Sequence, residues 1–436
     1  MDTLALTGGK ALLPDGTVEP ADVLVDREGG TIAAVGADID GVNEATETID
    51  TTGCVVIPGL VNAHTHVSMT LLRGYADDTP LETWLREDIW PVEAALTPDD
   101  IEVGAELGVV EMIGSGTTAF ADMYFAEDRV ADVVDRAGMR ALLGHGAVTI
   151  GKDEEAAHAD IEESVAVAAD LDGAADGRIR TAVMPHSLTT VGEPFLREAV
   201  EGAAEVGVPI HLHANETVDE VDPIVEERGI RPMEYAEGIG ALAEGNFFAH
   251  GVHLDATEID LLAESGTSIV HCPASNMKLA SGMAPVQDLL DAGVTVALGT
   301  DGAASNNDLD PFDEMRDAAM VGKIAAGDAA AVPAESVLRM ATAAGADTLG
   351  LPGGRIEAGA AADLAVVDLD APHLTPAHDV ASHLVYAARG SDVRDTICNG
   401  RVLMRDRVLT TLDPDRVMER ASAAAADLVA RAEDRS

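Results

Sequence analysis

The stretch Pro58-Gly59-Leu60-Val61-Asn62-Ala63-His64-Thr65-His66 joins an apolar run to two histidines that are separated by one residue. An apolar run that ends in polar residues is typical of a buried strand whose end lies at a functional edge. Side chains two positions apart on a strand point to the same side, so His64 and His66 are expected to share one metal ion. Because a single His-x-His pair is common by chance, the prediction depends on ligands from elsewhere in the chain.

The same alternation of a short apolar run and an Ala-rich helical segment recurs from about residue 58 to residue 350. Eight runs are predicted as parallel strands: Ile57–Val61, Thr117–Met123, Arg140–His145, Arg180–Met184, Val208–His213, Asn246–His250, Thr267–Cys272 and Val294–Gly299. Helices are expected between them, most clearly at Asp99–Ile113, Glu154–Leu171 and Pro333–Leu349. This pattern predicts an α/β fold, a (β/α)8 TIM-type barrel over residues 58–355, with catalytic residues where strands end.

The two ends of the chain depart from this period. Residues 1–57 and 356–412 alternate in β fashion, with clear strands at Asp363–Asp368 and Thr396–Leu403. We expect these segments to form one small composite β-sandwich from both termini. Residues 413–436 are Ala-rich and amphipathic and are expected to form a C-terminal helix that begins near Pro414.

Charge is the dominant feature of the composition. The chain of 436 residues carries 78 acidic and 27 basic side chains, a net charge of −51. A surface this acidic repels polyanions and excludes general nucleic-acid binding. Lysine is scarce and the acidic residues are dispersed, a pattern typical of proteins from high-salt cytoplasm, so a halophilic source is expected.

Other classes are also excluded. No apolar run reaches the roughly 20 residues that span a bilayer, and the first residues lack a basic and apolar leader. We therefore expect a cytoplasmic protein without a membrane partner. The three cysteines lie far apart, so neither a disulfide framework nor a thiolate zinc site is indicated.

Three more predicted strands end in potential ligands. The fifth ends at His213, the sixth at His250 and the eighth is followed by Asp301. The carboxyl ends of barrel strands meet on one rim, so these side chains should approach His64 and His66. Neutral imidazoles with one carboxylate and an open position form the ligand set of a catalytic zinc or iron site.

The chain resembles the amidohydrolase superfamily, and within it the 5'-methylthioadenosine/S-adenosylhomocysteine deaminase group, which includes 5'-deoxyadenosine deaminase-like members. The resemblance spans nearly the whole length and is carried by Pro58–Tyr75, Trp90–Glu93, Pro185–Ser187, His211–Thr217, Ala249–Leu254, His271–Lys278 and Leu298–Asn307. It implies that His64, His66, His213 and Asp301 bind one divalent metal ion, Zn²⁺ or alternatively Fe²⁺. Binuclear members use a carboxylated lysine after the fourth strand, and none of the four lysines lies near Arg180–His186.

The resemblance also implies catalytic roles and a reaction. Asp301 would take a proton from the attacking water, His250 would hold the resulting hydroxide, and Glu216 would protonate the substrate ring. Glu93 and His186 would contact the sugar hydroxyls and the nucleoside. The reaction expected is deamination of adenosine-type nucleosides, namely 5'-deoxyadenosine, 5'-methylthioadenosine, adenosine and S-adenosylhomocysteine, by an enzyme that forms a dimer or tetramer.

Some residues leave alternatives open. His145 stands where relatives that accept S-adenosylhomocysteine have an arginine, which favours smaller 5'-groups, although a protonated His145 could still bind a carboxylate. His211 is expected to face the helical layer and to be structural. The alternative activity is hydrolysis of another aminated ring of the guanine, cytosine or triazine type; a non-catalytic barrel is disfavoured because all four ligands are present.

Overall fold

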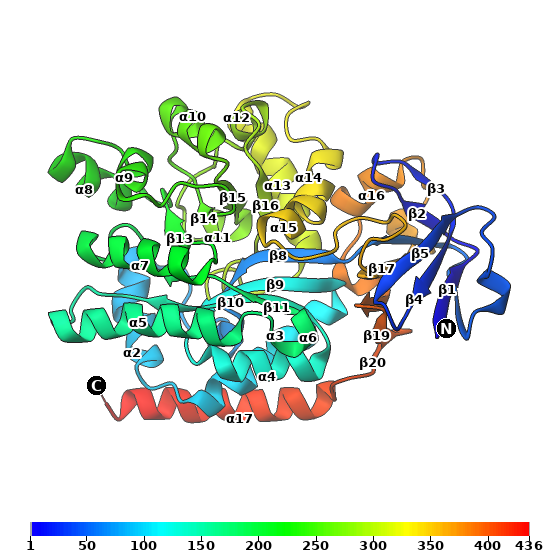
Figure 1. The fold of residues 1–436 in the computed structure, drawn as a ribbon, viewed down its shortest axis with the longest axis horizontal. Helices are drawn as coiled ribbons and strands as arrows, with labels where there is room; N and C mark the ends of the chain where they lie inside the picture. The colour runs from blue at the N-terminus through cyan, green and yellow to red at the C-terminus, as the bar shows by residue number, and fades with distance from the viewer. Residues whose placement is uncertain (1, 436) are drawn as a thin grey trace.

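A computed structural model describes residues 2–435 of the chain. Parallel strands at the centre of the molecule form a barrel, and helices surround it (Figure 1). The barrel strands are β8 (Leu60–Thr65), β9 (Thr117–Tyr124), β10 (Arg140–Ala147), β11 (Ile179–Thr181) with β12 (Met184–Pro185), β13 (His211–Ala214), β14 (Phe247–His250), β15 (Ser268–His271) and β16 (Val296–Leu298). The predicted TIM-type architecture is confirmed.

Two seams join the strand groups β8–β12 and β13–β16. At one seam Val183 bridges Ile210 and the His211 amide donates to the Val183 carbonyl. At the other, Asn62 and Thr300 exchange hydrogen bonds, and the Asp301 amide donates to the His64 carbonyl over 3.0 Å. This second seam therefore places His64 and Asp301, two predicted metal ligands, side by side.

The predicted first strand is wrong in its boundaries. Residues Ile57–Val61 divide between β7 (Cys54–Pro58), which pairs with strands of the terminal sheet, and β8, which enters the barrel. Gly59 lies at the division, where a Cβ atom would approach Thr118 Oγ1 to 2.1 Å. Glycine therefore allows the chain to pass between the two sheets against β9.

Both termini contribute to two sheets that pack on each other at the right of Figure 1. One sheet has the order β5 (Thr31–Gly36), β4 (Asp22–Asp26), β1 (Thr3–Thr7) and β6 (Glu47–Asp50). The other has the order β20 (Val408–Leu409), β19 (Arg401–Arg405), β18 (Val393–Cys398), β17 (Leu364–Asp368), β7, β2 (Lys10–Leu12) and β3 (Val18–Pro20). The stretch Thr396–Leu403, expected as a strand, is a hairpin that turns at Asn399 and Gly400.

Most of the helices that cover the barrel begin at a side-chain cap or end at a left-handed glycine. Those that cover the barrel are α3 (Pro98–Gly114), α4 (Glu127–Ala137), α5 (Glu154–Leu171), α7 (Glu193–Val206), α8 (Val218–Arg228), α9 (Pro232–Ile239), α10 (Ala256–Ser265), α11 (Pro273–Lys278), α12 (Val286–Asp291) and α13 (Pro311–Ala326). For example, Thr97 and Asp100 form a reciprocal capping box at the start of α3. The predicted helix Pro333–Leu349 is two helices, α14 (Ala334–Met340) and α15 (Ala343–Thr348).

Shorter and terminal helices complete the chain. They are α1 (Leu81–Thr83), the π-helix η3 (Trp84–Ile89), α2 (Trp90–Glu93), α6 (Ala174–Gly177), α16 (Val380–Tyr386) and α17 (Pro414–Glu433), with 3₁₀ turns at Val42–Glu44, Val67–Leu72, Pro372–Leu374 and Gly390–Asp392. The C-terminal α17 lies along α3, where Arg431 pairs with Asp100 at 2.5 Å.

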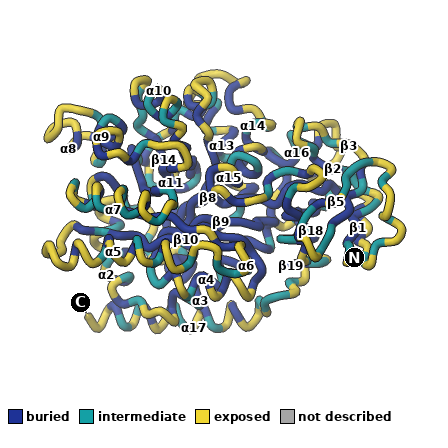
Figure 2. Tube along the Cα trace, in the orientation of Figure 1, coloured by how far each residue is buried: buried dark blue, intermediate teal, exposed yellow. Residues whose placement is uncertain are grey.

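The buried core of the molecule lies along the barrel strands. The barrel strands are buried except at Arg180 of β11, whereas the outer sides of the helices are exposed (Figure 2). Small side chains fill the barrel interior, among them Ala63 of β8, Ala121 of β9, Ala182 between β11 and β12, and Ala297 of β16. Among residues 2–435, no helix is long and apolar enough to cross a membrane.

Candidate active site

A cavity of about 910 Å³ opens at the carboxyl ends of the barrel strands. Its lining includes seven of the predicted site residues: His66, Glu93, His186, His213, Glu216, His250 and Asp301. His64 lies directly beneath and is fully buried. The chain therefore brings together residues from β8, α2 and four further strand ends in one concave site.

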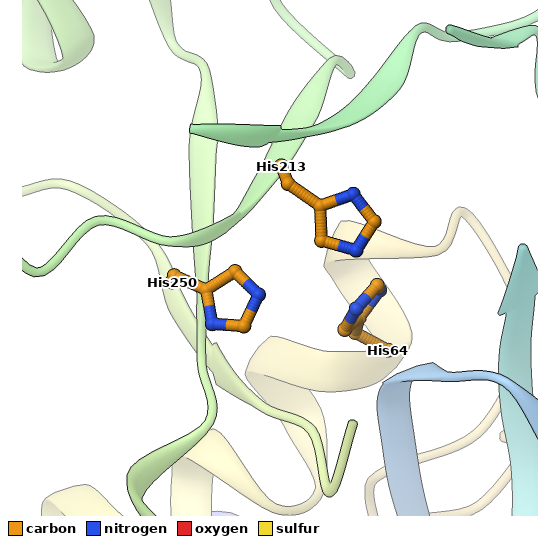
Figure 3. Close-up of side chains that lie close together, drawn as sticks. All are labelled: His64, His213 and His250. Atoms are coloured by element: carbon orange, nitrogen blue, oxygen red, sulfur yellow. The ribbon is translucent and has the colours of Figure 1, made fainter. Parts of the chain in front are cut away.

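The four predicted metal ligands and the predicted catalytic residue His250 form two overlapping groups that share His64. In one, His64 Nε2 and His66 Nε2 lie 3.6 and 3.3 Å from Asp301 Oδ1. Two ligands of one tetrahedral zinc ion are separated by about 3.4 Å, given bond lengths of 2.0–2.1 Å. In the other, His64, His213 and His250 gather around the same space (Figure 3), with ligand atoms within 4.8 Å of one another.

Hydrogen bonds fix which nitrogen of each ring faces this space. The Nδ1 atom of His66 donates to the Met123 carbonyl at 2.6 Å, and Nδ1 of His213 donates to the His186 carbonyl at 2.7 Å. His250 Nδ1 donates to Asn276 Oδ1 at 2.9 Å. Because Nδ1 holds the proton in each case, Nε2 keeps its lone pair for a metal ion or a water molecule.

His211 is placed differently from the expectation. The prediction that it faces the helical layer is wrong: the ring is fully buried inside the barrel, and its Nε2 lies 2.9 Å from His64 Nδ1. His211 and His213 are two positions apart on β13, so strand alternation turns both to the same side. The other nitrogen of His211, Nδ1, donates to the Phe247 carbonyl at 2.9 Å.

Asp301 is held on both oxygens. Ser275 and Ser305 donate hydroxyl hydrogen bonds to Oδ2 at 2.6 and 2.8 Å, and the Gly302 amide donates to Oδ1 at 2.7 Å. Burial raises the pKa of this carboxyl, but the adjacent imidazoles of His64 and His66 outweigh that effect and hold it well below the usual range. The carboxyl group is therefore ionised.

Two of these residues have strained backbones. His250 and Asp301 have φ angles of 76° and 61°, in the left-handed region that non-glycine residues seldom occupy. Both lie at the ends of barrel strands, where the backbone leaves the sheet and turns the side chain over the cavity. Strain that persists at such positions is typical of functional sites.

Glu216 lies next to His250 at the edge of the group of potential metal ligands. Its Oε2 is 3.7 Å from His250 Nε2, and Oε1 accepts a hydrogen bond from Ser281 at 3.2 Å. Burial raises the pKa of Glu216 above the ordinary value. A carboxyl group with a raised pKa beside a metal site is suited to pass a proton to a substrate.

Glu93 and His186 occupy neighbouring parts of the wall. Tyr124 donates its hydroxyl to Glu93 Oε1 at 2.6 Å, which leaves the second carboxylate oxygen for a ligand, and burial raises the pKa of this carboxyl. His186 Nδ1 contacts the Thr190 hydroxyl at 2.9 Å. Burial, with the nearby charges of His66 and His64, lowers the pKa of His186 to about 3, so this ring is neutral.

The cavity does not reach His145. This buried ring lies behind Asp160, whose Oδ1 contacts His145 Nε2 at 3.1 Å. The other oxygen of Asp160 accepts from the Val148 amide and pairs with Lys152, both at 2.7 Å. Asp160 and Lys152 line the cavity instead, so the expected substrate contact of His145 is replaced at the wall by an ion pair.

Several supporting residues were not predicted. They are Tyr124, Asp160, Thr190, His211, Ser275, Asn276 and Ser305. Ser275, Asn276 and Ser305 lie within the segments His271–Lys278 and Leu298–Asn307 that carry the resemblance. The resemblance therefore indicates that these segments are functional, but the sequence does not show which side chains the three residues bind. Asp160 is one acid among many on a charged helix and gives no signal in the sequence.

Comparisons with known proteins agree with this geometry. Residues 55–403 match the model of the amidohydrolase family. The chain is 66% identical over 434 residues to a 5-methylthioadenosine/S-adenosylhomocysteine deaminase of Haloarcula marismortui, covering 100% of both chains. It is 46% identical to a 5'-deoxyadenosine deaminase of Methanothermobacter thermautotrophicus, with 97% of this chain and 98% of the relative covered.

A solved structure gives the same result. An adenosine deaminase from Xanthomonas campestris with bound zinc superposes with a TM-score of 0.91 at 37% sequence identity, covering 98% of each chain. The matching family model and the full-length relatives establish one conclusion: the chain belongs to the amidohydrolase family.

Proposed function

We propose that this chain is a metal-dependent aminohydrolase that converts adenosine-type nucleosides and water to the inosine derivative and ammonia. The observation that carries the proposal is the common orientation of the histidine rings: three Nδ1 atoms donate to acceptors in the barrel wall, which turns each Nε2 toward the space beside Asp301. The names of the full-length relatives support the substrate class.

One Zn²⁺ ion fits this donor set, with His64, His66, His213 and Asp301 as the residues that would hold it; Fe²⁺ is the alternative. His64 Nε2 supports the assignment because it is buried and has no hydrogen-bond partner among residues 2–435. A lone pair buried without a partner is costly unless a ligand uses it. When bound, a divalent ion lowers the pKa of water to about 7 and so supplies hydroxide at neutral pH.

The surrounding residues move the protons. The Asp301 carboxylate accepts a proton from the attacking water, and His250 Nε2 accepts a hydrogen bond from the oxygen that remains. Glu216 donates a proton to N1 of the purine as the oxygen bonds to C6, and the proton held by Asp301 passes to the amino group. The C6–N bond then breaks and ammonia leaves, while the hydroxyl on C6 gives its proton back to Glu216 and becomes the carbonyl of the inosine product.

The sugar lies toward Glu93 and His186 in this proposal. A carboxylate can accept hydrogen bonds from both ribose hydroxyls, and Tyr124 holds Glu93 in place from behind. His186 is neutral and adjoins His213, with ring centroids 4.6 Å apart, so its free nitrogen can contact the nucleoside.

The cavity favours a small, uncharged 5'-group. Among the described residues, its basic side chains are Arg86 and Lys152, and each is paired with a carboxylate, Arg86 with Glu82 at 2.9 Å and Lys152 with Asp160 at 2.7 Å. Apolar side chains, including Leu81, Trp84, Leu85, Ile89, Phe125 and Ile150, form much of the remaining wall. We therefore place 5'-deoxyadenosine, 5'-methylthioadenosine and adenosine ahead of S-adenosylhomocysteine.

Ammonia release from a panel of substrates tests the proposal. The metal-loaded protein is assayed in high salt with these four nucleosides and with adenine, guanine, cytosine and an amino-triazine. We expect 5'-deoxyadenosine, 5'-methylthioadenosine and adenosine to have higher kcat/KM values than S-adenosylhomocysteine and the free bases. A preference for a free base or triazine would favour the alternative activity. We also propose that the chain is a homodimer or homotetramer of the cytoplasm, which light scattering can test for the assembly.

A further inference from the structure

We propose that His211 is a positioning residue that fixes the tautomer and the ring orientation of His64 for metal binding. The inference rests on the metal site of the proposed function but not on the identity of the substrate. Metal binding is measured without a nucleoside, so its failure is distinguishable from failure of the deaminase proposal.

Three groups form a chain of hydrogen bonds through the barrel interior. The Phe247 carbonyl can only accept, so the His211 Nδ1 atom that lies 2.9 Å away carries a proton and donates it. His211 Nε2 is thereby left as an acceptor, and it lies 2.9 Å from His64 Nδ1. The proton of His64 is held on Nδ1, and Nε2 is free on the side of His66 and Asp301.

His64 needs this intermediary because of its depth. The Nδ1 atoms of His66 and His213 reach backbone carbonyls directly. His64 lies lower in the barrel, fully buried, and its Nδ1 meets the ring of His211. The Phe247 carbonyl lies on the far side of the His211 ring. His211 therefore links His64 to a carbonyl, whereas His66 and His213 bind their carbonyls directly.

Packing holds His211 in the orientation that this role requires. Its ring stacks on the Phe247 ring with a centroid separation of 4.1 Å and an angle of 16° between planes. Both residues are fully buried on adjacent strands, where His211 is paired with Phe247 in the sheet register. Rotation of His211 would break two hydrogen bonds and the stack together.

The test compares His211→Leu with His211→Gln. Leucine has nothing to accept the His64 proton, whereas the glutamine amide can accept from His64 and donate to the Phe247 carbonyl. The Zn²⁺ dissociation constant of each purified protein is measured in high salt by competition with a chromophoric chelator. We expect His211→Leu to bind zinc about 10–100-fold more weakly than the parent, the usual effect of losing such a partner, and His211→Gln to recover most of that affinity.

His271→Leu is the matched control, because His271 is also a buried strand histidine but neither ring nitrogen has a hydrogen-bond partner among residues 2–435. Its zinc affinity should remain close to that of the parent. Thermal unfolding of the metal-free proteins distinguishes the positioning role from a merely structural one, because loss of a structural residue would lower Tm without changing zinc affinity.

If His211→Leu does not fold, His211→Asn takes its place, since its amide is too short to reach both partners. Parental zinc affinity in the Leu or Asn variant, or an equal loss in the Gln variant, would overturn the inference.

Discussion

At the scale of single residues, the site is a set of imidazoles whose orientations are fixed before any ligand arrives. His66, His213 and His250 each donate from Nδ1 to an acceptor in the protein, and Asp301 is bound by two serine hydroxyls and an amide. A preorganised site loses little free energy to reorientation when it binds.

Replacing Glu216 with glutamine should lower kcat by about 10²–10⁴-fold, because the amide cannot donate and recover a proton. Zinc content, measured by elemental analysis, should stay unchanged, since Glu216 is not among the groups of potential metal ligands. An unaltered rate would remove Glu216 from the mechanism.

Replacing Glu93 with glutamine should reduce discrimination for ribose. The parent is expected to prefer adenosine over 2',3'-dideoxyadenosine, because hydrogen bonds to a charged acceptor contribute about 1.5–3 kcal/mol. In Glu93→Gln the ratio of the two kcat/KM values should fall by about tenfold or more. A ratio equal to the parental one would place the sugar elsewhere in the cavity.

At the scale of elements, the loop between β10 and α5 determines the charge at the cavity wall. Asp160, on the second turn of α5, reaches back to His145 at the end of β10, to the Val148 amide and to Lys152. Burial raises the pKa of Asp160, but the hydrogen bonds from His145 and Lys152 outweigh this and lower it overall. The helix therefore supplies the Asp160 carboxylate, which pairs with Lys152, the cation of the loop.

Replacing Asp160 with asparagine should release Lys152 for a substrate carboxylate. We expect kcat/KM for S-adenosylhomocysteine, divided by that for 5'-methylthioadenosine, to rise on the order of tenfold, the value of one charge-assisted hydrogen bond. Asp170→Asn, at an exposed position of the same helix, is the control for a general change in charge. A ratio that does not rise would show that Lys152 does not face the 5'-group.

At the scale of the whole molecule, repulsion among the acidic side chains lowers the stability that the packed core provides. A net charge of −51 is spread over two sheets and the helical shell, and most arginines are already paired with carboxylates, as Arg140 is with Asp363 inside the molecule at 2.7 Å. The remaining acidic excess has no protein partner to offset it. Mobile cations must then screen it.

Salt should therefore raise stability. The screening length falls from about 10 Å at 0.1 M to about 3 Å at 1 M ionic strength. We expect Tm, followed by circular dichroism, to rise steadily with KCl over this range and the protein to lose structure on dialysis into dilute buffer. A Tm that does not depend on salt would contradict the halophilic character inferred from composition.

Stability in high salt should also depend on pH through Asp308. Burial, together with the charges of Asp313 and Glu111, raises its pKa from 3.8 to about 6. The folded state then holds this proton more tightly than the unfolded state does, so its stabilising effect is complete below about pH 4 and is lost as the pH rises through about 6.

The variant Asp308→Asn isolates this effect, since an amide oxygen can still accept from the Asp310 amide. The difference in Tm between variant and parent should grow in favour of the variant as the pH rises from about 4 to 7. A constant difference across this range would mean that Asp308 does not titrate as its burial implies.

The sequence by itself determined the barrel and the residues that face its rim. The βα period repeats locally, and strand alternation places His64 with His66, so both could be predicted without knowing which segments are neighbours. The same alternation places His211 on the side of His213, and the structure agrees with that rule and not with the expectation that His211 faces the helical layer.

Only the tertiary structure decided what surrounds those residues. His211 meets His64, which is 147 residues away, and Asp160 masks Lys152 and His145 through contacts between a loop and a helix. Such pairs depend on which strands and helices become neighbours when the barrel closes. In a chain with 78 acidic residues, no local pattern distinguishes Asp160 as the carboxylate that pairs with His145 and Lys152.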